Sequence, residues 1–184
     1  MPAGELDRWA ADALRVIREQ LAGDHVWAKK LDASRGASTG AVHLAVLVEP
    51  YLSFLLEGTK TIESRFGMRR SIPYGRVARG DLMLLKQSSG PVVGISEITK
   101  AAYFDLRSEP VRAIRKRFGA EIAADAEFWR HCEGASYATL LDVRAVRALD
   151  PIPCPKKDRR GWVIFDRALL RSVATQNLAT TRLE

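Results

Sequence analysis

The stretch Gly58–Arg65, with the sequence GTKTIESR, decides how the fold of this chain is interpreted. Residues 43–48 before it are rich in Val and Leu, as a largely buried strand is, and Tyr51–Glu57 is typical of a short helix. Gly58 stands where a left-handed helix C-cap favours glycine. We therefore expect the chain to turn at Gly58 into a strand over residues 60–66, with charged side chains beside the turn.

Further strands are predicted after this stretch, and Gly80-Asp81 precedes the first of them. Hydrophobic alternation and turn residues indicate strands at 82–86, 91–98, 137–148 and 162–165. The first two are separated by four turn residues and form a hairpin. The proline-rich segment 150–155 is predicted to be a loop, because proline interrupts a strand ladder.

Helical periodicity is predicted at both ends of the chain and in the middle. Apolar residues recur every three or four positions over residues 6–21, and the small, polar segment 32–40 that follows is typical of a linker or a long surface loop. Two helices are expected at 110–118 and 120–129, separated at Gly119. Asp166 is expected to cap a final helix that includes Leu169, Leu170 and Val173. We expect residues 1–40 to be a helical extension with its linker, and residues 41–184 to be the main domain.

Composition limits the classes of function. The 184 residues carry 29 Lys and Arg against 22 Asp and Glu, and the formal net charge of +7 favours an acidic partner such as nucleic acid. Cys132 and Cys154 lack the spacing of a structural zinc site, so no metal is expected. No nucleotide-triphosphatase or hydrolase motif is present, and no cofactor is suggested. Without an apolar run long enough for a membrane span or a secretory signal, we expect a cytoplasmic protein.

The segment GTKTIESR and the later Gly80-Asp81 resemble the ASCH domain family, a relative of the PUA-like RNA-binding barrels. The hallmark of that family, Gly-x-Lys-x-x-Glu-x-Arg, is matched by Gly58, Lys60, Glu63 and Arg65. The likeness covers roughly residues 43–149. It implies an α+β fold, namely a small PUA-like β-barrel with flanking helices, and a role in binding RNA or nucleotides.

Some members of the family remove the acetyl group from N4-acetylcytidine, and others are reported to cut RNA. In the amidohydrolases, the catalytic set includes a lysine and a threonine three residues later. Lys60 matches the lysine, whereas Glu63 stands at the position of the threonine. A carboxylate there would require a different mechanism, such as activation of water by Glu63.

The residues of the motif also suggest chemistry of their own. If 61–65 is extended, Thr61, Glu63 and Arg65 share one face of the strand. Lys60, at the turn, is free to swing to either side. Lys60 and Glu63 are therefore the candidate catalytic pair, with Glu63 as base and Lys60 stabilising negative charge. The alternative is that the two form an ordinary ion pair.

A basic stretch with aromatic residues follows the motif and extends the candidate site. Arginine suits phosphates and exposed rings can stack on bases, although Phe66 and Tyr74 could equally belong to the core. At the end of the 82–86 strand, Lys86 and Ser88 could reach a phosphate or a base, or could form a polar hairpin tip. The candidate ligand-binding residues are Lys60, Glu63, Arg65, Arg69, Arg70, Lys86 and Ser88.

Three functions remain open on the sequence. The first is binding of RNA, or of a modified nucleoside or nucleotide, in a basic cleft around Lys60, Glu63, Arg65 and Lys86. The second is hydrolysis of a nucleoside amide or of an RNA phosphodiester. The third is a protein-interaction module in which the helix at residues 5–21 docks a partner or a second copy, which a solvent-exposed apolar stripe on that helix would support.

Overall fold

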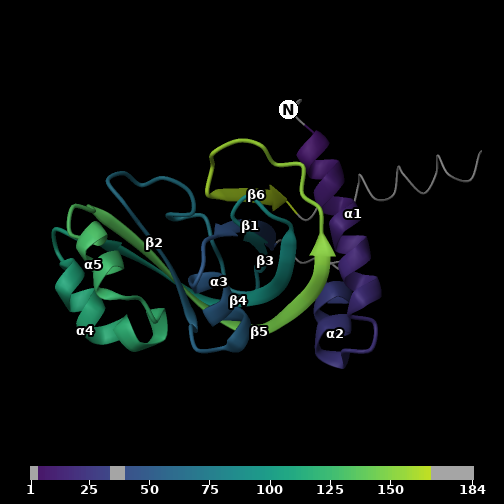
Figure 1. Cartoon of the computed structure of the whole chain (residues 1–184), viewed down its shortest axis with the longest axis horizontal. Coiled ribbons are helices and arrows are strands. Elements are labelled where there is room, and N and C mark those ends of the chain that lie inside the picture. The colour runs from purple at the N-terminus through teal and green to yellow at the C-terminus, as the bar shows by residue number, and fades with distance from the viewer. Residues whose placement is uncertain (1–3, 34–39, 167–184) are drawn as a thin grey trace, which may run out of the picture.

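The structure is a computed structural model that describes residues 4–33 and 40–166 (Figure 1). Its helices are α1 (Glu5–Gln20), α2 (His25–Ala33), α3 (Tyr51–Glu57), α4 (Val111–Ile122) and α5 (Ala126–Cys132). Its strands are β1 (Ala41–Leu47), β2 (Ile62–Gly67), β3 (Leu82–Gln87), β4 (Val92–Asp105), β5 (Tyr137–Ile152) and β6 (Trp162–Asp166). None of the helices in these ranges is long and apolar enough to cross a membrane.

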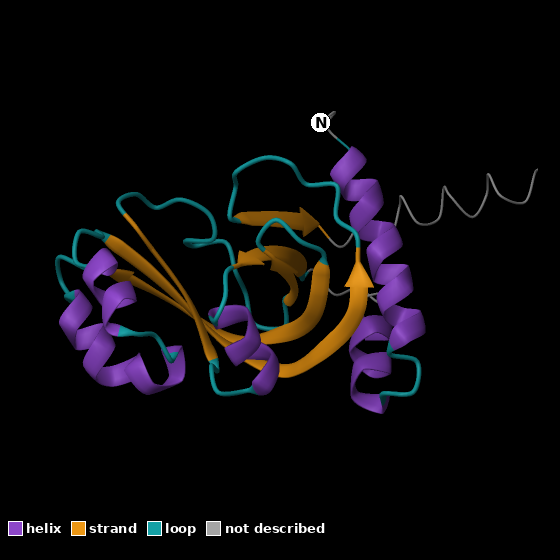
Figure 2. Ribbon diagram, viewed as in Figure 1, coloured by secondary structure: helices purple, strands orange, loops and turns teal. Residues whose placement is uncertain are grey.

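The six strands form one sheet in the order β2-β5-β4-β3-β1-β6. The β1–β3 pair is parallel, and the other neighbouring pairs are antiparallel. Figure 2 shows that the long strands β4 and β5 bend strongly, so that the sheet curls into a half-barrel. The mixed sheet with five helices confirms the predicted α+β class.

The curvature of the sheet has a local cause. The β4–β5 ladder shifts register at three places on β4, which are 92–94, 95–97 and 98–100. Each irregularity bends the strands. Ala145 on β5 adopts a positive φ of 52° at this bend. On β4, a Cβ added to Gly94 would lie 2.8 Å from Leu56 Cδ2 and 3.1 Å from the backbone oxygen of Arg147, so glycine suits the close packing at this position.

Helices α1 and α2 cover one face of the sheet. The apolar stripe predicted on the first helix is buried, and Ala10, Leu14 and Ile17 pack with sheet residues such as Leu44 and Leu84 in one cluster. Helix α2 was not predicted from the sequence. It is anchored by Trp27, which is fully buried and whose Nε1–H donates to Ala145 O at 2.9 Å.

Two further clusters fill the rest of the fold. Helix α3 packs inside the curled sheet through Leu52 and Leu55, beside Met83 and Leu85. Helices α4 and α5 cover β2 and the adjoining ends of β4 and β5, where the ring of Phe66 lies against Phe128 and Trp129. Phe66 therefore packs against this cluster, as one of its two predicted roles required.

Several predicted boundaries were wrong. Helix α4 continues through Gly119, because one glycine weakens a helix without ending it when Ile114 and Ile122 are buried on either side. Strand β5 continues past Pro151 to Ile152, which pairs with Val92, so the expected loop begins later. The predicted C-terminal helix lies outside the described residues, as does most of the 32–40 linker. The division of the chain at residue 40 stays a prediction, although α1 and α2 share a core with the sheet.

Candidate functional site

The motif folds locally as the sequence predicted. Gly58 caps α3 in the left-handed region with φ 82°, and the Lys60 N–H donates to Phe54 O, which turns the chain toward β2. Strand β2 then pairs with β5, with Arg65 opposite Thr139. Because side chains alternate, Ile62 and Phe66 face α4 and α5, while Glu63 and Arg65 share the other face.

Lys60 is buried rather than free to swing, because its side chain lies between α3 and the end of α4. Its Nζ donates to Ile122 O at 3.0 Å and lies 3.6 Å from Glu63 Oε2, and only 3% of the residue is exposed. Burial lowers the pKa of Lys60; the Glu63 carboxylate opposes this shift, and the charge of Arg65 adds to it. The expectation of a mobile turn lysine was therefore wrong, and the pair is a buried ion pair.

Arg65 joins the two edges of the sheet. Its Nε lies 2.8 Å from Glu63 Oε1, an ion pair whose N–H is not aligned for a hydrogen bond, and its Nη2 donates to Val46 O on β1 at 3.0 Å. Its guanidinium carbon lies 5.1 Å from the ring centroid of Trp162 on β6. Since β2 and β6 are the outermost strands, Arg65 bridges the open side of the half-barrel.

A buried polar network continues from Trp162 to Asp81. Trp162 Nε1–H donates to His43 Nδ1 at 3.0 Å, so the proton of the neutral imidazole is on Nε2, which donates to Asp81 Oδ2 at 2.8 Å. Asp81 also accepts from the backbone N–H groups of Ala41 and Ala78. Burial would raise the pKa of Asp81, but these hydrogen bonds outweigh it and the pKa is lowered. Asp81 thus anchors its own turn and holds β1 and His43 as well.

A pocket of about 270 Å³ opens beside this bridge, under the loop that follows β2. Arg65 and Thr139 belong to the sheet wall, whereas Arg69 and Tyr74 come from the loop, and Tyr137 comes from the start of β5. Met68 and Ile72 on the loop are largely exposed. The lining consists of Arg65, Phe66, Gly67, Met68, Arg69, Ser71, Ile72, Pro73, Tyr74, Tyr137 and Thr139. It contains two arginines and no carboxylate.

Tyr137 lies at the rim between two further arginines. The guanidinium carbons of Arg70 and Arg107 lie 5.0 Å and 5.9 Å from its ring centroid, and Arg70 also lies 5.6 Å from that of Tyr74. Both oxygens of Asp105 accept from Arg107. The Arg107 hydrogen bonds lower the pKa of Asp105 to about 2 even though burial opposes the shift, and the charge of Arg70 contributes to the lowering. Sequence reasoning missed Arg107, because only the β4–β5 pairing brings it to Tyr137.

The structure brings together most, but not all, of the candidate residues. Lys60, Glu63 and Arg65 are in contact, and Arg69 and Arg70 lie next to the same pocket. Lys86 is buried at the end of β3, and its Nζ donates to Gln87 O at 3.0 Å. Burial raises the pKa of Cys154, whereas the backbone N–H of Lys156 and the charge of Lys86 oppose that rise. Ser88 lies exposed in the following turn, and neither residue lines the pocket.

Residues 4–33 and 40–166 contain no group of three or more His, Cys, Asp or Glu side chains placed to hold a metal ion. The buried thiol of Cys132 has a pKa raised to about 11 by burial, so it is protonated at neutral pH and is a poor nucleophile.

The pocket itself offers positive charge, aromatic surface and the hydroxyl of Thr139. This combination suits recognition of an anionic, planar ligand.

Comparison with known proteins identifies the fold. No protein-family model matches the sequence, and no curated protein matches it. Among solved structures, ASCH from Zymomonas mobilis has a TM-score of 0.56 at 17% identity, over 73% of this chain and 94% of that chain. Serine-to-alanine and tyrosine-to-phenylalanine mutants of that protein have TM-scores of 0.56 and 0.55 at 19% identity, each over 76% of this chain and 95% or 96% of theirs. The chain therefore has an ASCH-type fold, an α+β half-barrel.

Proposed function

We propose that this chain binds RNA, or a modified nucleoside or nucleotide, in the pocket under the loop after β2. The observation that carries the proposal is the pocket lining, which combines Arg65 and Arg69 with the rings of Tyr74 and Tyr137 and includes no acidic side chain. Arginine forks bind phosphate oxygens, and tyrosine rings stack on unpaired bases. The ASCH-type fold supports a nucleic-acid-binding role in general.

The pocket size supports a small ligand or one unstacked unit of a longer chain. Its volume of about 270 Å³ is just below the range of roughly 300–1,000 Å³ that is usual for sites of drug-sized ligands. A duplex does not fit such a space, whereas a single base with its sugar is of suitable size. We therefore expect single-stranded RNA to bind more tightly than double-stranded RNA.

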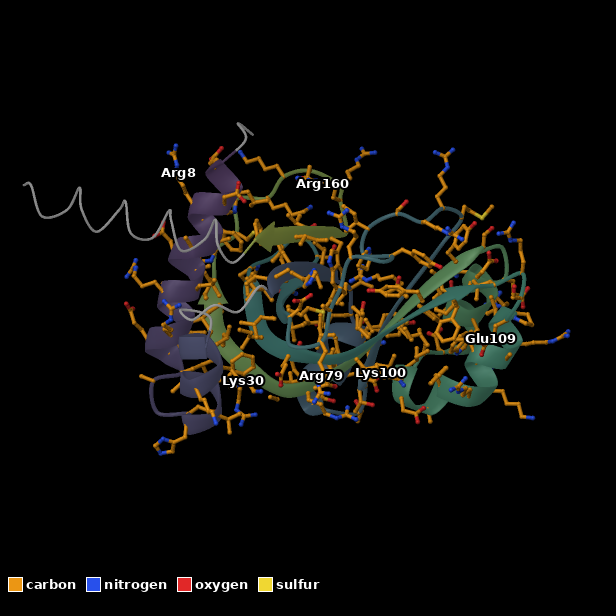
Figure 3. The ribbon with its side chains drawn as sticks, turned by 180° about the vertical axis from the view of Figure 1, so that it is seen from behind. Arg8, Lys30, Arg79, Lys100, Glu109 and Arg160 are labelled. Atoms are coloured by element: carbon orange, nitrogen blue, oxygen red, sulfur yellow. The ribbon has the colours of Figure 1, made fainter. Side chains whose placement is uncertain are left out.

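A titration of labelled single-stranded RNA, followed by fluorescence anisotropy at two salt concentrations, tests the proposal. Arg69→Ala combined with Arg70→Ala should weaken binding and reduce the slope of log K against log salt by about 1 for each phosphate that the protein no longer neutralises. Arg8→Ala is the matched control, because Arg8 is exposed on α1, at the opposite end of the molecule from Glu109 near α4 (Figure 3). An unchanged slope in the Arg69/Arg70 variant would reject this pocket as the site.

The geometry favours a positioning role for Glu63 over a role as general base. Its carboxylate is buried between Lys60 and Arg65 and does not line the pocket, whereas a base must reach the proton that it removes. The RNA from the titration, and N4-acetylcytidine incubated with the protein, should therefore remain intact. Products that appear with the wild type and vanish with Glu63→Gln would instead establish hydrolysis with Glu63 as base.

The interaction-module hypothesis predicted an exposed apolar stripe on the first helix. The stripe on α1 is buried against the sheet of its own chain, with Ala10 and Ile17 fully covered. The described part of α1 therefore offers no apolar face of this kind to a partner, and the nucleotide proposal is the better supported of the two.

A further inference from the structure

Part of the positive charge around the pocket is uncompensated, and this limits the ligands that suit the pocket. Arg69 and Arg70 have no carboxylate within ion-pair distance among residues 4–33 and 40–166. The carboxylates beside the pocket, Glu63 and Asp105, are each already paired with an arginine. A neutral nucleoside would leave this positive charge unmatched, whereas a phosphorylated ligand would supply the missing anion.

The rim around Tyr137 has the parts of a phosphate subsite. Arg70 and Arg107 both lie within 6 Å of the centroid of the same ring, so a group at the edge of that ring is within reach of both side chains. Asp105 fixes the fork of Arg107 through two hydrogen bonds, which orients its remaining N–H donors in advance. The ring of Tyr137 itself lines the pocket, so this rim adjoins the space proposed for the base.

We infer that the pocket takes a phosphorylated nucleotide, or a nucleotide unit of RNA, with its phosphate between Arg70 and Arg107 and its base beside Tyr74 and Tyr137. The inference rests on the proposed function and deepens it, because it separates nucleotides from unphosphorylated nucleosides as ligands. Arg107 is the new member of the site, and Asp105 is the residue that positions it. The phosphate can be on either the 5′ or the 3′ side of the bound base.

Isothermal titration calorimetry with the full chain tests this inference. The probes are the four ribonucleosides and their 5′- and 3′-monophosphates, measured at about 50 mM and 200 mM salt, the range over which phosphate contacts change strongly. At the lower salt we expect one monophosphate series to bind at least about tenfold more tightly than the nucleosides, as for one charge-assisted hydrogen bond or more. Whether the 5′- or the 3′-monophosphates bind more tightly shows on which side of the bound nucleoside the phosphate lies.

The variants for this test are Arg70→Ala, Arg107→Ala and the two combined, with Arg8→Ala as control. Arg70 and Arg107 are both exposed, so these variants should fold normally. Each single change should lower nucleotide affinity several-fold more than it lowers nucleoside affinity, and the double variant should bind the two classes equally. Asp105→Asn should reduce the nucleotide preference less than Arg107→Ala does, because Arg107 keeps its charge but loses its orientation.

The outcomes separate this inference from the proposed function. Equal binding of nucleosides and monophosphates by the wild type would overturn the inference and leave the proposed function standing. A nucleotide preference that survives in the Arg70/Arg107 double variant would overturn it too, because the phosphate would then be bound elsewhere. If no monophosphate binds, the inference fails, and the RNA titration decides separately whether the proposed function fails with it.

Discussion

The face of the sheet under α1 and the edge of the sheet around β2 bury their side chains in opposite ways. Under α1 the buried residues are almost all aliphatic or aromatic, with Ala10, Leu14 and Ile17 packed on strand residues. Around β2 the fold buries Lys60 and Glu63 and part of Arg65. Apolar burial stabilises a fold directly, whereas buried charges lose hydration that their pairing only partly restores.

The apolar packing under α1 stabilises the fold, whereas the buried charges around β2 hold side chains in one particular arrangement. A buried ion pair is a weak indicator of stability, but breaking one is costly. Here the pair orients Arg65, which bridges β2 to β1 and β6 and lines the pocket. We interpret the Lys60–Glu63 pair as the support that fixes Arg65 at the ligand site.

The largest effect on stability is expected for Glu63→Ala. The change leaves Lys60 and Arg65 without the carboxylate that they share, and the uncompensated charges should reduce the free energy of unfolding by about 3–5 kcal/mol. Urea unfolding followed by circular dichroism measures this loss. Glu57→Ala, at an exposed position on α3, should change it by less than about 0.5 kcal/mol. A loss below about 1 kcal/mol for Glu63→Ala would show that the pair does not hold the motif.

Ile17→Ala should be nearly as destabilising but should leave ligand binding unchanged. Ile17 is fully buried under α1, and its truncation should cost about 3 kcal/mol through reduced apolar burial and the cavity that remains. Unfolding and RNA affinity should be measured on the same preparation, at a temperature where the variant stays folded. A fall in RNA affinity would mean that the two ends of the molecule are coupled.

Arg65→Lys should have an intermediate effect on stability and a clear effect on binding. Lysine keeps the charge but loses the hydrogen bond from Nη2 to Val46 O and the stacking on Trp162, at a cost of about 1–3 kcal/mol. Relative to the wild type, the variant should show a larger increase in amide hydrogen exchange rate in β2 and β6 than in β3. Uniform exchange behaviour across these strands would argue against Arg65 as the bridge between the sheet edges.

Lys60→Met should remove one contribution to the pH dependence of stability. The native pKa of Lys60 is lowered from its ordinary value of 10.5, so native Lys60 releases its proton at a lower pH than unfolded Lys60 does. The unfolded state then binds more protons, and this residue makes stability rise with pH between the two values. The rise should be missing in Lys60→Met, which difference curves of unfolding free energy from about pH 7 to about pH 10.5 will show. Identical curves would mean that burial does not perturb Lys60.

Local patterns carried the predictions that were confirmed. The turn at Gly58, helix α3 and the side-chain alternation along β2 depend on residues that are close in sequence, and the buried stripe on α1 follows from its own spacing. The resemblance carried by GTKTIESR and Gly80-Asp81 pointed to the ASCH-type fold that the comparison with solved structures shows.

Long-range pairing decided what sequence reasoning missed. Trp162 and His43 are 119 residues apart, and only the β1–β6 pairing makes their hydrogen bond. The bridge from Arg65 to Trp162 likewise depends on the curl of the whole sheet. Lys86 and Ser88 were grouped with the motif because they lie at the end of a strand in a polar turn, but that position does not determine which cluster a side chain joins. Burial of Lys60 depends on α4, whose contact with the motif the sequence gives no means to foresee.

The most direct test of the central claim is to map backbone amide chemical shifts of isotope-labelled protein during titration with a short single-stranded RNA. If the RNA binds in the pocket, the shifted amides will cluster in residues 65–74 and 137–139 and near Arg107, while those of α1 and α2 stay unchanged. Shifts that cluster on α1, or at Lys86 and Cys154, would contradict the central claim, because the ligand would then bind away from the pocket that the motif supports.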